Sequence, residues 1–295
     1  METIVQQTAG DGPVSNPSEK TSLLRFPIVL EPTKSWMPIA LGDIWAYREL
    51  LYFLMWRDLK VRYKQTMLGA AWVIMQPLVM TLVFTVFLGK LARVPSAGLP
   101  YALLVFSGLI PWMFFSSAVT TSGNSLVGNA HLITKVYFPR LIVPMAAVGA
   151  RLVDFAISFL VLGGLMYYYR IPLTSKIAIL PLFAVMLTAL ALAVGTLTSA
   201  WNVKYRDVGI ILPVLIQLWM FASPIVYPVE IVPERWRQLY ALNPMVGLIG
   251  GFRAALLNRD LDWKAFAVSA VTTVLLLWYA LYDFRRMERR FADVV

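Results

Sequence analysis

The sequence predicts an all-α integral membrane protein with six transmembrane helices. Apolar residues make up 59% of the chain and charged residues 14%, whereas soluble domains hold roughly 45–50% and 25%. The apolar residues gather into runs of about 20, the length that an α-helix needs to cross a bilayer. Lys and Arg flank these runs, so the net charge of +10 indicates orientation in a membrane and not nucleic-acid binding.

The region before the first span is predicted to have two parts. Residues 1–35 hold four prolines among Ser, Thr, Gly and charged residues, which predicts a flexible cytoplasmic tail. This stretch lacks the apolar core of a cleavable signal peptide, so we expect the first span itself to direct insertion. Within residues 36–68, helical apolar spacing over 43–64, with Asp43 as the N-cap, predicts an amphipathic helix in the membrane interface. The alternative is a helix packed on a soluble domain.

Six apolar runs define a predicted transmembrane domain over residues 69–283. The spans cover about 69–89, 101–122, 141–168, 177–200, 209–227 and 264–282. Prolines inside the first, second and fifth spans predict kinks, and three tyrosines at the end of the third suit a membrane interface. Lys and Arg near the span ends favour one side, which predicts that both termini, including a basic tail over 284–295, are cytoplasmic.

The loop over residues 123–140 is predicted to contain a short cytoplasmic helix. Its apolar residues fall on one helical face, at Leu126, Val127, Ala130 and Ile133. Such a helix could dock in the groove of a partner, or it could lie on the protein's own cytoplasmic face.

The connection between the last two spans is predicted to hold two short helices over residues 233–257, opened by Pro233 and Pro244. The second stretch is apolar but only about 14 residues long, too short to cross a bilayer. We therefore expect the pair to dip into the outer leaflet and return, because its apolar side chains need an apolar host. An ordinary surface hairpin is the alternative.

Signals for catalysis are weak, and we expect neither a catalytic residue nor a cofactor or metal on this chain. A phosphate-binding loop needs Gly-x-x-x-x-Gly-Lys-Ser/Thr. Here Gly89-Lys90 is followed by Leu91, and Phe84 stands where the first Gly belongs. With one His and no Cys, a multi-ligand zinc site is not expected.

Two ionisable residues, Arg151 and Asp154, fall inside the predicted spans. They are three residues apart on one helix face, so they can form an ion pair. Each alone would cost about 2.5–3.5 kcal/mol at the centre of a bilayer. The pair could contact substrate or act as a gate, or it could pack the third span against its neighbours. An ion-paired Asp154 is a poor proton carrier, which favours a driving force supplied by another chain.

Aromatic residues concentrate in the first, second and fifth predicted spans. Aromatic rings can pack on the CH faces of sugars and give contacts that suit a moving polymer, although such rings also face lipid or core. The candidate channel residues are Trp72, Phe84, Phe87, Trp112, Phe115, Trp219, Phe221 and Tyr227.

Six sequence segments follow one another over about residues 40–285. They are residues 57–77, 108–115, 135–144, 202–207, 223–228 and 242–245. In this order they resemble the membrane subunit of type-2 ABC exporters for polysaccharides, the family of O-antigen, capsule and teichoic-acid permeases. The resemblance implies the pore-forming permease of an ATP-driven exporter that moves a lipid-linked glycan from the cytoplasm across the bacterial inner membrane.

The resemblance also implies partners. Two copies of the chain would form the pore, lined by the first and fifth spans, and each copy would dock an ATP-binding subunit that carries ATP and Mg. One alternative is a type-2 ABC permease for a small molecule, drug or lipid. A membrane sugar transferase is a further alternative, but it would need clustered carboxylates, and those in this sequence are scattered.

Site residues follow from the same resemblance. The 43–64 helix would be an interface helix, and the 123–138 loop would hold a coupling helix that contacts the ATPase through Leu126, Asn129, His131 and Lys135. The 233–257 pair would form an external gate with Pro233, Trp236, Pro244 and Phe252. A basic cluster at the cytoplasmic entrance could attract the lipid pyrophosphate, or it could serve only to orient the protein; it comprises Arg57, Lys60, Arg62 and Lys64.

Overall fold

The computed structural model describes residues 41–64, 71–96 and 98–288, and this part of the chain is helical without strands. The prediction of an all-α membrane fold is confirmed. The predicted tail over 1–35 lies outside the described residues.

The helices are α1 Leu41–Ala46, α2 Arg48–Lys64, α3 Ala71–Phe84, the π-helix η2 Thr85–Leu91, α4 Tyr101–Gly123, α5 Ser125–Gly128, α6 Ala130–Lys135, α7 Ile142–Tyr168, the 3-10 helix η3 Ser175–Ile179, α8 Leu180–Lys204, α9 Val208–Phe221, the 3-10 helix η4 Val229–Ile231, α10 Glu234–Ala241, α11 Pro244–Leu256 and α12 Trp263–Glu288.

Five of the described helices are long and apolar enough to cross a membrane, or up to six if the bent pair α10–α11 counts as one span. The five comprise α3 continued by η2, then α4, α7, η3 with α8, and α12. They overlap the first, second, third, fourth and sixth predicted spans. The last helix runs to Glu288, so the expected tail over 284–295 begins inside a helix.

The predicted fifth span is shorter than expected. Helix α9 holds 14 residues and ends at Phe221, whereas the prediction extended to residue 227. Pro224 explains the end, because a proline disfavours helical geometry at the residue before it, here Ser223, and supplies no N–H of its own. By itself, α9 is below the length that crosses a bilayer.

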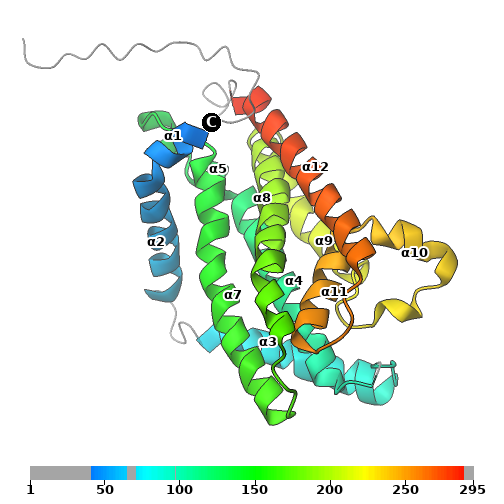
Figure 1. Ribbon diagram of the computed structural model, residues 1–295. Helices are drawn as coiled ribbons and strands as arrows, with labels where there is room; N and C mark the ends of the chain where they lie inside the picture. Colours follow the sequence, from blue (N-terminus) through cyan, green and yellow to red (C-terminus); the bar gives the residue numbers. More distant parts are fainter. Residues whose placement is uncertain (1–40, 65–70, 97, 289–295) are drawn as a thin grey trace, which may run out of the picture. The chain divides into compact units, whose positions relative to one another are not determined.

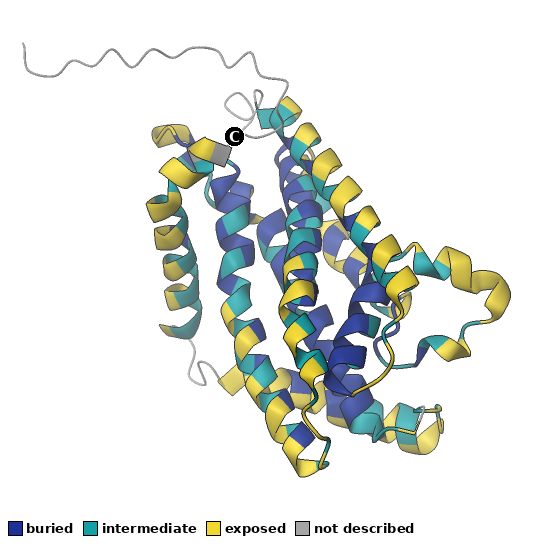
Figure 2. Cartoon of the chain, in the orientation of Figure 1, coloured by how far each residue is buried: buried dark blue, intermediate teal, exposed yellow. Residues whose placement is uncertain are grey.

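Helix α4 forms the centre of the bundle and packs against α3, α7, α8, α9 and α11. Most of its residues are buried (Figure 2). Small residues allow this close packing: a Cβ on Gly108 would lie 2.7 Å from the carbonyl oxygen of Ile225, and one on Gly195 of α8 would meet the Ser122 side chain.

A second apolar cluster joins the neighbouring ends of several helices. It contains Leu54 of α2, Leu126 of α5, Ile142 of α7 and Phe284 of α12, all with 2% or less of their surface exposed. This cluster fixes the α5–α6 segment to the bundle.

Helix α2 lies beside α7 (Figure 1), and its other face is exposed (Figure 2). The exposed face carries Trp45 of α1 and Tyr52, Phe53 and Trp56 of α2. Asp43 is not an N-cap, because it lies inside α1, which already includes Leu41. Placement of α2 in a membrane interface remains a prediction.

Helices α10 and α11 meet at an angle of 98°. The apolar side chains of α11 are buried against α4, α8 and α12. The bundle itself supplies the apolar host that these side chains were expected to need. A membrane-dipping gate stays a prediction.

Candidate functional site

The Asp154 carboxylate is the centre of a polar cluster between α2, α4 and α7. Arg62 and Tyr63 of α2 contact its two oxygens, and Arg151 Nη1 lies 3.8 Å from Oδ2. Arg151 also donates from Nη2 to Thr121 Oγ1 on α4, over 2.7 Å. The sequence indicated Arg151 and Asp154, but it gave no signal that α2 supplies two further partners.

The contacts of this cluster join three helices. Burial lowers the pKa of the Arg62 guanidinium, but arginine stays charged near neutral pH. Asp154 thus has two guanidinium groups and one hydroxyl as neighbours, and these contacts connect α7 to α2.

The four basic residues predicted at the cytoplasmic entrance are divided in the structure. Arg57 pairs with Asp58 at 2.8 Å and donates to Asn129 Oδ1 at 2.9 Å, and Arg62 contacts Asp154. Lys60 and Lys64 are exposed, four residues apart on one helix face. Of the four, Lys60 and Lys64 are therefore the most accessible to an anion outside the fold.

The residues predicted for ATPase coupling do not form one surface. Leu126 is fully buried, so it packs inward and cannot reach a partner in this conformation. The predicted single helix is broken at Asn129 into α5 and α6. His131 and Lys135 are exposed. Val127, which the sequence pattern placed on the apolar face, is exposed beside them, and two further exposed apolar residues were missed, namely Val136 and Tyr137.

The predicted channel aromatics separate into core and surface residues. Trp112 and Phe115 are 4% and 0% exposed, so neither presents a surface to a passing substrate. Phe84, Trp219 and Tyr227 are partly buried, and Trp219 Nε1 donates to Asn243 Oδ1 at 2.9 Å. The exposed members are Trp72, Phe87 and Phe221.

The predicted gate residues also divide. Phe252 is fully buried among aromatic side chains of α7 and α8, and Pro244 is buried at the start of α11. Pro233 and Trp236 are exposed at the start of α10. The start of α11 is fixed by Asn243, whose side chain accepts from the Met245 N–H at 3.0 Å.

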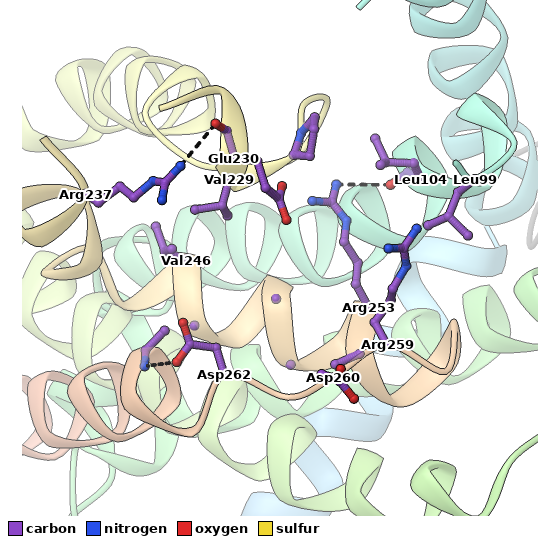
Figure 3. A pocket seen from close by; sticks show the side chains of 16 residues that line it. Leu99, Leu104, Val229, Glu230, Arg237, Val246, Arg253, Arg259, Asp260 and Asp262 are labelled. Carbon is purple, nitrogen blue, oxygen red and sulfur yellow. Dashed lines mark hydrogen bonds between the residues drawn. The ribbon is translucent and has the colours of Figure 1, made fainter. Parts of the chain in front are cut away.

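A cavity of about 490 Å³ opens beside α11 (Figure 3). Its charged lining comprises Glu230, Arg237, Arg253, Arg259, Asp260 and Asp262. Arg253 is committed to backbone carbonyls, donating to Ile225 at 2.5 Å and Leu104 at 3.1 Å. It thereby ties α11 to α4 and to the irregular segment after α9. A single Arg in the apolar run of α11 was the available sequence signal.

In the described part of the chain, no three His, Asp or Glu side chains gather as metal ligands.

Known proteins resemble most of this chain. The family described as ABC-2 type transporter matches residues 49–257, from α2 to the end of α11. The O-antigen export system permease protein RfbA of Myxococcus xanthus is 31% identical over 259 residues, which cover 86% of this chain and 98% of that protein. An RfbA of Klebsiella pneumoniae is 28% identical over 84% and 95% of the two chains. The polysialic acid transport protein KpsM of Escherichia coli is 23% identical over 79% and 91%.

Proposed function

The chain belongs to the ABC-2 type transporter family of membrane proteins, and from that premise we propose that it is the permease subunit of an ATP-driven exporter for a lipid-linked polysaccharide. The observation that carries the proposal is similarity over nearly the whole length of permeases named for O-antigen export. A protein named for polysialic acid transport matches over a similar length. These relatives favour a glycan over a drug or small lipid as the substrate.

The energy for transport would come from a separate ATP-binding subunit, which would carry ATP and Mg. A docking surface for that subunit is available beside α5 and α6, where His131 and Lys135 are exposed together with apolar side chains of Val127, Val136 and Tyr137. An exposed apolar patch with a basic rim is typical of a protein–protein interface. This placement would put α5 and α6 on the cytoplasmic side. We further propose that both termini are cytoplasmic and that the chain lies in the bacterial inner membrane.

A second copy of the chain would complete the pore. Only 11% of the most apolar stretch of α3 and η2 is buried, and α9 exposes one apolar stripe at Ile210, Val214, Leu218 and Phe221. These surfaces need lipid or protein against them. Pairing two copies through α3 and α9 would place the exposed aromatics Trp72, Phe87 and Phe221 near the pore. Lys60 and Lys64 remain as candidates for attracting a lipid pyrophosphate.

Deleting the gene tests the proposal directly. We expect lipid-linked glycan to accumulate inside the cell and surface glycan to disappear, and the wild-type gene to restore both. Glycan that still reaches the surface, together with altered sensitivity to small toxic compounds, would instead support the small-molecule alternative.

Reconstitution tests the source of energy. Vesicles holding this chain alone should not transport glycan, whereas vesicles that also hold the ATP-binding subunit should transport it when ATP and Mg are added. Uphill transport by the chain alone would overturn the proposal.

A further inference from the structure

We propose that Asn202 is a positioning residue that transmits movement of the α5–α6 segment to α9. The inference rests on the proposed function, in which α5 and α6 receive the ATP-driven movement and α9 borders the pore. Asn202 lies in the last turns of α8, is 4% exposed, and belongs to a sequence segment to which no role has been assigned above.

The Asn202 side chain joins three parts of the chain. Its Nδ2 donates to the carbonyl oxygen of Gly123 and to Asn124 Oδ1, both over 3.0 Å. Its Oδ1 accepts from the N–H of Gly209 over 3.1 Å. Both amide hydrogens are therefore used, along with one lone pair of the oxygen. One buried amide thus connects the end of α4, the residue before α5 and the first turn of α9.

Asn202 reinforces the start of α9. The N-cap residue Asp207 makes no side-chain bond to the first N–H groups of the helix, and the Gly209 N–H donates to the carbonyl oxygen of Arg206 over 3.2 Å. Asn202 adds a second acceptor for this N–H from a neighbouring helix. A Cβ on Gly209 would lie 3.0 Å from Asn124 Oδ1 and 3.1 Å from Asn202 Oδ1, so glycine allows the close approach.

Helix α9 has few buried side chains. Its buried side chains are Leu212 and Ile216, and the Leu212 side chain contacts Gly123, where a Cβ would lie 2.7 Å away. Both the polar and the apolar contacts at this end therefore converge on the junction between α4 and α5. A displacement of that junction moves the start of α9 directly.

The other end of α5 has a polar contact of its own. Asn129, between α5 and α6, accepts from Arg57 of α2 over 2.9 Å. Its Nδ2 donates back to the carbonyl oxygen of Ser125 over 2.8 Å. The α5 helix therefore lies between two asparagines. Asn124 is linked to α9 through its hydrogen bond with Asn202, and Asn129 is linked to α2 through its hydrogen bond with Arg57. The contact to α9 is buried through Asn202, which makes it the more rigid of the two.

Comparing ATP hydrolysis with export separates transmission from folding. For Asn202→Ala in the complex with its ATP-binding subunit, we expect ATP hydrolysis within about twofold of wild type and a fall in export of about tenfold or more, the range of typical coupling effects. Ser199→Ala is the matched control, because Ser199 is fully buried on the same helix and its hydroxyl bonds to Thr196 of α8. Unchanged export in Asn202→Ala, or hydrolysis and export that fall in parallel, would overturn the proposal.

A second variant covers the case in which Asn202→Ala does not fold. Asn124 is exposed, so Asn124→Ala should accumulate normally while it removes the bond between Asn202 and the residue that precedes α5. We expect the same uncoupling to a smaller extent, about fivefold, and full export in this variant would count against the proposal. If the wild-type complex shows no ATP-driven export, the proposed function itself has failed; if the wild type exports and both variants match it, only the present inference has failed.

Discussion

Helices α4 and α3 look alike in sequence but occupy opposite environments. The spans they form hold 23 and 21 residues, and their most apolar stretches are similar in hydropathy. Nevertheless, 78% of the most apolar stretch is buried in α4, against 11% in α3 with η2. Figure 2 shows the contrast between the buried centre and exposed outer faces. Hydropathy thus locates a span without showing what surrounds it.

The difference follows from the size of the side chains at the helix contacts. Helix α4 brings Ser107, Gly108, Ser122 and Gly123 to its interfaces, where all four are buried. Small residues let backbones approach closely, which is the main source of attraction between helices in lipid. The buried residues of α3 are Pro77 and Thr81, and the rest of its surface is left for lipid or another copy of the chain.

The largest effect expected from this contrast concerns two phenylalanines. Phe115→Ala in α4 removes a fully buried ring and should lower stability by about 3–5 kcal/mol. Phe87→Ala in η2 removes a ring that is 60% exposed and should change stability by less than about 0.5 kcal/mol. Thermal unfolding of the purified proteins in detergent would compare them. Equal losses of stability would show that the Phe87 ring in η2 is as buried in the purified protein as the Phe115 ring in α4.

The charged contact of α2 extends the comparison to a helix at the periphery that does not rely on packing alone. Asp154→Asn weakens the contacts of Arg62, Arg151 and Tyr63, and we expect a loss of about 1.5–3 kcal/mol, because these hydrogen bonds involve charged groups. Proteolysis within α2 should become faster at the same time. Asp260→Asn, at an exposed carboxylate, is the matched control. Unchanged protection of α2 in Asp154→Asn would contradict the structural role of the cluster.

Two glycines sharpen the role of small residues. Gly108→Ala places a Cβ 2.7 Å from Arg253 Nη2 and from the carbonyl oxygen of Ile225, so it should cost about 1–3 kcal/mol. Gly164→Ala in α7 has open space around it and should be neutral or stabilise the helix by up to about 1 kcal/mol. The two melting temperatures should therefore move apart. A harmless Gly108→Ala would mean that the α4–α11 contact tolerates more volume than its distances allow.

The smallest effect concerns the buried hydroxyl of Thr81 in α3, which has no hydrogen-bond partner within the described chain. Thr81→Val removes an unsatisfied polar group and should raise stability by about 1 kcal/mol or leave it unchanged. A clear loss of stability would instead indicate that an assembled copy or ordered water supplies a partner. This measurement is sensitive to what covers α3.

The site could be predicted from sequence only in part. Arg151 and Asp154 stood out because charges are rare in apolar runs, yet their partners Arg62 and Tyr63 are about 90 positions away and could not be inferred. The aromatic residues were identified as a class, but whether Phe115 or Phe87 meets substrate depends on burial. The α11 side chains were expected to need an apolar host, and only the structure shows that α4, α8 and α12 supply it.

The sequence by itself determined the all-helical membrane class, the position of most spans and the family, because these depend on run length, local charge and ordered motifs. Only the tertiary structure decided which spans form the core, where helix α9 ends, and how Asn202 joins α4, α8 and α9. The physical reason is that a lipid-facing residue and a residue in a membrane-protein core are equally apolar. Close approach of backbones and the pairing of distant polar groups distinguish them, and both arise only when the helices meet.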